Sequence, residues 1–263
     1  AALKSIIENE VPKWDLALSL DALLASLEQN NPKQQPDIKT DAPQVIYRDH
    51  KSVLVVLDGD PKMAKLDNTD YNRVMNTPYF LIQDPKSSAY YLYGTKVWYT
   101  APSLTGTWSI EKKPSKDLQR VQDWLEDQAK QQGGNPDSAA PAPTSAPDII
   151  VRTKPTELLQ TDGEAQFSTI EGTQLLYVKN SENDIFRSIT DQKYYILLSG
   201  RWFNSGSLDG PWNYMASDKL PSDFAKIPEG SEKDNVLASV AGTNAAHEAL
   251  LDAQVPQTAA VSR

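Results

Sequence analysis

An internal duplication sets the architecture of this chain. Residues 42–108 align with residues 146–212 without a gap, at an offset of 104 positions. Of the 67 aligned positions, 17 are identical, and many of these are turn glycines and aromatic residues. A repeat of this length forms a small domain that occurs twice rather than a solenoid. The duplication therefore predicts two related modules in tandem.

Both repeats end in the same pattern, YY-x6-W-[YF]-x3-SL-x-G-x-W. This pattern predicts a β-meander in which one strand carries the tyrosine pair and the next carries the first tryptophan. A turn that contains glycine follows, and a third strand begins at the second tryptophan. Since side chains alternate along a strand, the two tyrosines of a pair are expected on opposite faces of the sheet. The fold class is predicted as mainly β with flanking α-helices, in two tandem related β-meander modules.

The segments outside the repeats are predicted from hydrophobic periodicity and from turn residues. Ser115 is a candidate N-cap, and Leu118, Val121 and Leu125 form the apolar stripe of the helix that follows it. The predicted organisation is an N-terminal helical segment over 1–30, a β module over 42–112, a helix over 113–130, a linker rich in proline, alanine, glycine and serine over 131–146, a second β module over 147–215, and a C-terminal extension over 216–263 with one short helix at 244–253.

Composition limits the chemistry and the partners. The chain has 35 acidic and 26 basic residues, a net charge of −9, which disfavours nucleic acid and anionic membrane surfaces as partners. No cysteine is present, so disulfides, thiolate metal ligands and thiol nucleophiles are excluded. No apolar run approaches the roughly 20 residues of a membrane-spanning helix. We expect neither a membrane span nor a cofactor.

Aromatic residues of the repeats are the candidate ligand-binding residues. Tyrosine and tryptophan rings on a β-sheet stack on the apolar faces of sugar rings and offer polar groups at their edges. The alternative is that these rings fill a small core, which a domain of this size without disulfides needs. The candidates are Tyr91, Trp98 and Tyr99 in the first repeat, and Tyr195, Trp202 and Phe203 in the second.

Catalytic and metal-binding patterns are weak in this sequence. His50 and His247 are the only histidines, and each is predicted to be a surface residue. Asp58 and Asp162, acids shared by both repeats, are explained by the turns they form with the following glycine. The acidic run at 67–70 lacks the spacing of a calcium-binding loop, and no phosphate-binding or zinc-protease motif occurs. We therefore predict that the chain is not an enzyme and has no metal site.

Several stretches resemble a family of exported bacterial envelope proteins labelled carbohydrate-binding, family V/XII. The stretches cover nearly the whole chain in order: DLALSLDALLASLE (15–28), residues 42–61, NTPYFLI (76–82), residues 90–108, residues 164–181, residues 194–212, LPSDFAKIP (220–228) and residues 235–261. The resemblance implies a periplasmic or cell-surface location. It also implies that the chain is a piece of a longer exported protein. It supplies no active-site residues.

Two functions remain open from the sequence. The first is a non-catalytic cell-envelope module that binds glycan, such as polysaccharide or peptidoglycan, or another polymer through surface aromatics; two tethered modules would gain avidity on a repetitive ligand. The second is a structural or assembly scaffold of an envelope complex that acts by protein–protein contacts. A hydrolase is a third, less favoured possibility.

Overall fold

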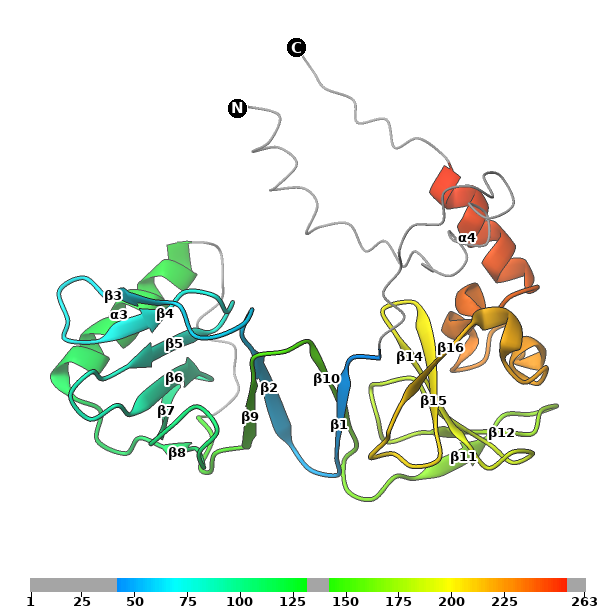
Figure 1. Ribbon diagram of the computed structural model, residues 1–263, viewed down its shortest axis with the longest axis horizontal. Helices are drawn as coiled ribbons and strands as arrows, with labels where there is room; N and C mark the ends of the chain where they lie inside the picture. Colours follow the sequence, from blue (N-terminus) through cyan, green and yellow to red (C-terminus); the bar gives the residue numbers. More distant parts are fainter. Residues whose placement is uncertain (1–41, 132–141, 255–263) are drawn as a thin grey trace, which may run out of the picture. The chain divides into compact units, whose positions relative to one another are not determined.

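The computed structural model describes residues 42–131 and 142–254 (Figure 1). The helical segment predicted over 1–30 and most of the linker predicted over 131–146 lie outside the described residues. The chain divides into two compact units. The described parts of one unit are residues 46–131 and 142–162, and those of the other are residues 42–45 and 163–254.

Each unit contains a six-stranded antiparallel sheet whose strands are adjacent in sequence order. The first sheet is formed by β3 (Met63–Lys65), β4 (Asn72–Val74), β5 (Phe80–Gln83), β6 (Tyr90–Gly94), β7 (Val97–Ala101) and β8 (Ser109–Ile110). The second is formed by β11 (Phe167–Thr169), β12 (Leu175–Val178), β13 (Ile185–Ser188), β14 (Tyr194–Leu198), β15 (Arg201–Ser205) and β16 (Asn213–Met215). The predicted fold class, mainly β with two meander modules, is confirmed.

Residues shared by the two repeats make the same backbone contacts in both sheets. The Asn76 side-chain oxygen accepts a hydrogen bond from the Lys62 amide at 2.9 Å. The equivalent Asn180 oxygen accepts from the Gln166 amide at 2.8 Å. These asparagines fix the loop that precedes the meander, because each satisfies a backbone donor that the sheet leaves free.

Turn positions of the duplication are also explained by the backbone. Gly59 and Gly163 have φ angles of +79° and +78°, a conformation that residues with a Cβ rarely adopt. The hydroxyls of Thr69 and Thr173 each donate to the carbonyl oxygen three residues earlier, at 2.9 and 2.8 Å. The duplication therefore preserves the fold at these positions.

Strands that precede the meanders pair across the repeats. The strands β2 (Ser52–Val56) and β9 (Asp148–Arg152) are parallel, with Ser52 opposite Asp148 and Val56 opposite Arg152. The strand β1 (Gln44–Arg48) is paired with β10 (Thr156–Gln160). In Figure 1 the two strands of each pair lie beside each other. The first strands of the second repeat therefore belong largely to the unit that contains the first repeat, and residue 162 ends that unit.

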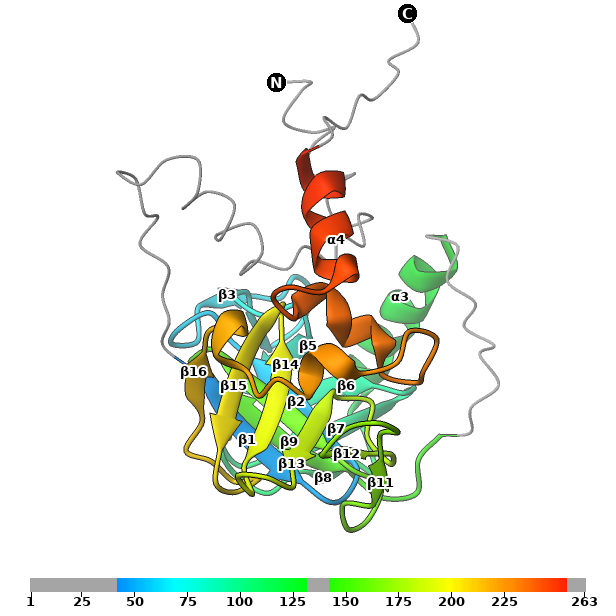
Figure 2. The ribbon, with the colours of Figure 1, turned by 90° about the vertical axis from the view of Figure 1, so that its right-hand side faces the viewer.

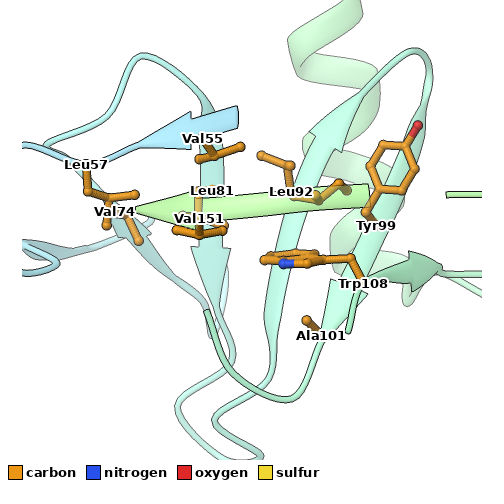
Figure 3. Close-up of a cluster of buried hydrophobic side chains, with 10 residues drawn as sticks. Val55, Leu57, Val74, Leu81, Leu92, Tyr99, Ala101, Trp108 and Val151 are labelled. Atoms are coloured by element: carbon orange, nitrogen blue, oxygen red, sulfur yellow. The ribbon is translucent and has the colours of Figure 1, made fainter. Parts of the chain in front are cut away.

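The strand β9 completes the core of this unit. Side chains from β2, β9 and the first sheet form one buried cluster (Figure 3). Ile149 and Val151 are supplied by β9, and Trp108 by the turn before β8. The core residues are Val55, Leu57, Val74, Leu81, Leu92, Tyr99, Ala101, Trp108, Ile149 and Val151. Three consecutive residues of β9 are buried, as expected for a parallel strand covered on both faces.

Helical segments cover one face of each sheet. The helix α3 (Lys116–Gln131) packs on the first sheet through Leu118 and Val121. It begins where predicted, since the Ser115 hydroxyl accepts a hydrogen bond from the Leu118 amide at 3.2 Å.

No helix in the described ranges is both long and apolar enough to cross a bilayer.

The second sheet is covered by a different kind of segment. Short 3₁₀ helices follow it, and they are η2 (Ser217–Lys219), η3 (Phe224–Lys226) and η4 (Asp234–Ser239). The side chains of Phe224, Val236 and Leu237 are buried against the sheet. Figure 2 shows η3 and η4 in orange beside β14 and β15. The helix α4 (Asn244–Gln254), predicted over 244–253, follows η4 and contacts it.

We expect Ile149→Ala to lower the free energy of unfolding of the unit 46–162 by about 2–5 kcal/mol, because it leaves a cavity in the core. Equilibrium denaturation followed by tryptophan fluorescence measures this loss. Lys154→Ala, at an exposed position two residues after β9, is the control and should change stability by less than about 0.5 kcal/mol. Equal stability of the two variants would show that β9 does not contribute to the core.

Candidate functional site

The six aromatic residues predicted to bind ligand are mostly covered. The buried residues are Trp98, Tyr99, Tyr195, Trp202 and Phe203, each at most 5 % exposed. Tyr91 is half-buried, and its ring contacts Tyr71 edge-on, with the centroids 5.7 Å apart. Burial of the five rings to this extent is typical of aromatic residues that fill a core. Ligand binding by these residues stays a prediction, and the geometry is that of the alternative, core-filling interpretation.

The two equivalent tryptophans show how the rings are covered. Trp98 lies between the sheet and α3, with its ring centroid 5.1 Å from that of Tyr93. Trp202 lies against Phe224 at 4.9 Å, and its indole nitrogen donates to the Ser239 carbonyl oxygen at 2.7 Å. Both rings therefore join the sheet to the segment that follows the repeat.

An open groove lies in the first unit, between α3 and the strands β3 and β4. Its volume is about 580 Å³. Two large apolar side chains are exposed there: Met75 at 55 % and Trp124 at 48 %. The lining residues are Ala64, Lys65, Leu66, Asp67, Asn68, Thr69, Arg73, Met75, Arg120, Val121 and Trp124. We call this site the α3–β4 groove.

Arg73 is the central polar group of the α3–β4 groove. Its guanidinium carbon lies 4.7 Å from the centre of the Phe80 ring, a cation–π contact. The Phe80 ring in turn lies 6.2 Å from that of Trp124. The buried Nε atom of Arg73 has no hydrogen-bond partner among the described residues. Because Nε is buried, an acceptor from outside the chain can reach only the rest of the Arg73 side chain, which is half-buried.

The groove carries more positive than negative charge. Its ionisable lining residues are Lys65, Arg73, Arg120 and Asp67. Arg120 is already engaged, since it donates to the Asp117 carboxylate at 2.5 Å. The groove therefore combines an apolar surface with a net positive charge, although the whole chain is acidic.

The groove was not predicted from the sequence, because the sequence-based candidates were the aromatic residues that the two repeats share. Trp124 follows Val121 by three positions in α3, next to the predicted apolar stripe. A tryptophan at the edge of such a stripe signals either extra packing or an exposed contact residue. Arg73 carried no signal of its own, since only the fold places it over Phe80.

A second cavity, of about 610 Å³, lies at the β6–β7 turn of the same unit. Three tyrosines line it: Tyr79, Tyr93 and Tyr99. Tyr79 is 37 % exposed, and the hydroxyl groups of Tyr99 and Thr95 share a hydrogen bond of 2.7 Å. Tyr99 is thus the one predicted ligand-binding residue of the first repeat that lines this cavity.

The histidines are exposed, as predicted. His50 Nδ1 lies 2.8 Å from the Asp49 carboxylate and His50 Nε2 lies 3.6 Å from that of Asp148. His247 lies on α4. Within 42–131 and 142–254, no three histidine or acidic side chains converge as metal ligands would.

The hydroxyl of Tyr93 links the first sheet to α3 by donating to Glu126 at 2.9 Å. Burial raises the pKa of Tyr93, and the Glu126 carboxylate raises it further. The folded state therefore holds this proton more tightly than the unfolded state. The contribution of Tyr93 to the free energy of unfolding is fully present below pH 10, and it decreases as the pH rises above 10. We expect Tyr93→Phe to lose less stability than the wild type between pH 9 and about 11, measured by chemical denaturation. An identical loss in both proteins would contradict this assignment.

The Trp202–Ser239 hydrogen bond gives a test with a built-in control. Trp202→Phe leaves the buried Ser239 carbonyl without its partner, whereas the Trp98 indole nitrogen has no partner among the described residues. Both substitutions remove similar volume. We expect Trp202→Phe to destabilise its unit by about 1–3 kcal/mol more than Trp98→Phe destabilises its own. Chemical denaturation measures the free energy of unfolding of both variants. Equal losses would show that the Trp202–Ser239 hydrogen bond does not contribute measurably to stability.

Comparison with known proteins does not assign a family. No protein-family model, no curated protein sequence and no solved structure matches this chain.

Proposed function

We propose that this chain is a non-catalytic interaction module that binds a partner protein through the α3–β4 groove. The observation that carries the proposal is the exposure of Trp124 and Met75 beside Arg73, in a cavity of about 580 Å³. Tryptophan, methionine and arginine are the residue types enriched in protein–protein interfaces. This function corresponds to the scaffold alternative from the sequence, and we propose the residues of the α3–β4 groove as its contact surface.

The duplication supports the same proposal. Residues that the repeats share, such as Asn76 and Asn180, are explained by turns and by the core. The groove residues differ between the repeats: Arg73 corresponds to Tyr177, and Met75 to Lys179. A surface that one copy has and the other lacks is a natural place for an activity that the fold itself does not require.

Glycan binding is the second candidate, favoured by the cavity lined by Tyr79, Tyr93 and Tyr99. Tyrosines around a cavity of this size can stack on a sugar ring. A location in the periplasm or at the cell surface, implied by the resemblance, is compatible with both candidates and stays a prediction.

The partner-binding proposal is tested by replacing Trp124 with a photo-crosslinking phenylalanine analogue in the full chain and irradiating its native cells. We expect one defined protein adduct. Ile189, which is 42 % exposed in the other unit, is the matched control position and should give none. The adduct partner is then purified, and Trp124→Ala should weaken its binding more than tenfold in calorimetry, as hot-spot residues do.

The opposite outcome is equally specific. Absence of an adduct at Trp124, together with a saturable change in fluorescence on adding soluble glycans or peptidoglycan fragments, would replace partner binding by glycan binding. Loss of that change in Tyr79→Ala protein would place the glycan in the second cavity.

A further inference from the structure

The two repeats differ in the contacts made by the side chain at position 73, which is Arg73, and at the equivalent position 177, which is Tyr177. Both residues lie on the sheet face that the following segment covers. The correspondence is secure, since the next residues, Val74 and Val178, are both fully buried. The second repeat therefore shows, within the same chain, what kind of segment this surface can accommodate.

In the second unit the surface is covered by the chain itself. The Tyr177 hydroxyl donates to the Glu232 carboxylate at 2.5 Å. The adjacent Lys233 forms an ion pair with Asp184 at 2.8 Å, and both side chains are less than one-fifth exposed. The covering segment thus brings a carboxylate to position 177 and a cation to position 184.

In the first unit both partners on the sheet have changed. Tyr177 is replaced by Arg73, and Asp184 is replaced by Phe80. Arg73 provides the cation that Lys233 provides in the other unit, and it lies over Phe80 rather than against an acid. A carboxylate at the place of Glu232 would find a stronger donor here, because a guanidinium is charged and a phenol is neutral. A cation at the place of Lys233 would find an aromatic ring and a like charge.

We propose that the α3–β4 groove binds an acidic segment of the partner protein, in which a glutamate or aspartate carboxylate accepts a hydrogen bond from Arg73 and an adjacent apolar side chain packs on Trp124. This inference rests on the proposed function and names the chemistry of the partner. It follows from the half-buried guanidinium of Arg73 over Phe80, the positive charge of the groove and the example of Glu232.

The test uses the full chain and a synthetic peptide with the sequence of residues 229–238 carrying Lys233→Leu, so that an apolar side chain follows Glu232. Binding is followed by the indole amide signal of Trp124 in ¹H–¹⁵N NMR spectra. We expect saturable binding with a Kd below about 1 mM. The same peptide with Glu232→Gln should bind about tenfold to a hundredfold more weakly, the factor typical of a hydrogen bond between charged groups.

Variants of the protein complete a double-mutant cycle. Arg73→Ala should weaken binding of the acidic peptide by a similar factor. In this variant, the change from Glu232 to glutamine in the peptide should have no further effect on the affinity. Arg73→Tyr, which installs the residue that the second repeat accommodates, guards against misfolding and should give the same result. Arg187→Ala is the matched control, because Arg187 also lies over an aromatic ring, that of Tyr194, in the other unit.

The outcomes separate this inference from the proposed function. No peptide binding to the wild type, or equal binding of the acidic and glutamine peptides, would overturn the inference. A partner cross-linked through Trp124 whose affinity does not change in Arg73→Ala would also overturn it, while leaving the proposed function in place. Absence of any cross-linked partner would instead overturn the proposed function.

Discussion

The parallel pairing of β2 with β9 is the contact on which the first unit depends. Each sheet is a meander with two faces to cover, and a two-stranded ribbon is too small to be stable alone. Pairing β2 with a strand from the second repeat brings Ile149 and Val151 onto the sheet face opposite α3. The first sheet is thereby covered by β2 and β9 on one face and, over part of its area, by α3 on the other.

The sheet faces that carry Trp98 and Trp202 show how two copies of one repeat can diverge. Trp98 and Trp202 are identical in the alignment and both are buried. Their covers are unrelated: a regular α-helix in the first unit and 3₁₀ turns in the second. The regular helix leaves part of its sheet uncovered, and the α3–β4 groove is the result. The irregular segment follows its sheet more closely, because Glu232 and Lys233 bond to side chains on that sheet.

Much of the fold could be predicted from local patterns. The ungapped offset of 104 positions is reproduced by strand after strand, and the Ser115 cap and the strand that carries the tyrosine pair form as expected. The candidate site could not be predicted in the same way. Aromatic residues such as Trp202 have the same sequence pattern whether they fill a core or bind a sugar, and only packing against Phe224 distinguishes the two.

The sequence by itself determined the duplication, the β-rich class, the turns and the first helical cap, because these depend on residues close together along the chain. The tertiary structure alone decided which strands pair between repeats, which rings are buried, and that Arg73 lies over Phe80 beside Trp124. Those features depend on side chains that approach each other across sheets and helices. Their energies come from burial and from desolvated polar contacts, which local periodicity does not encode.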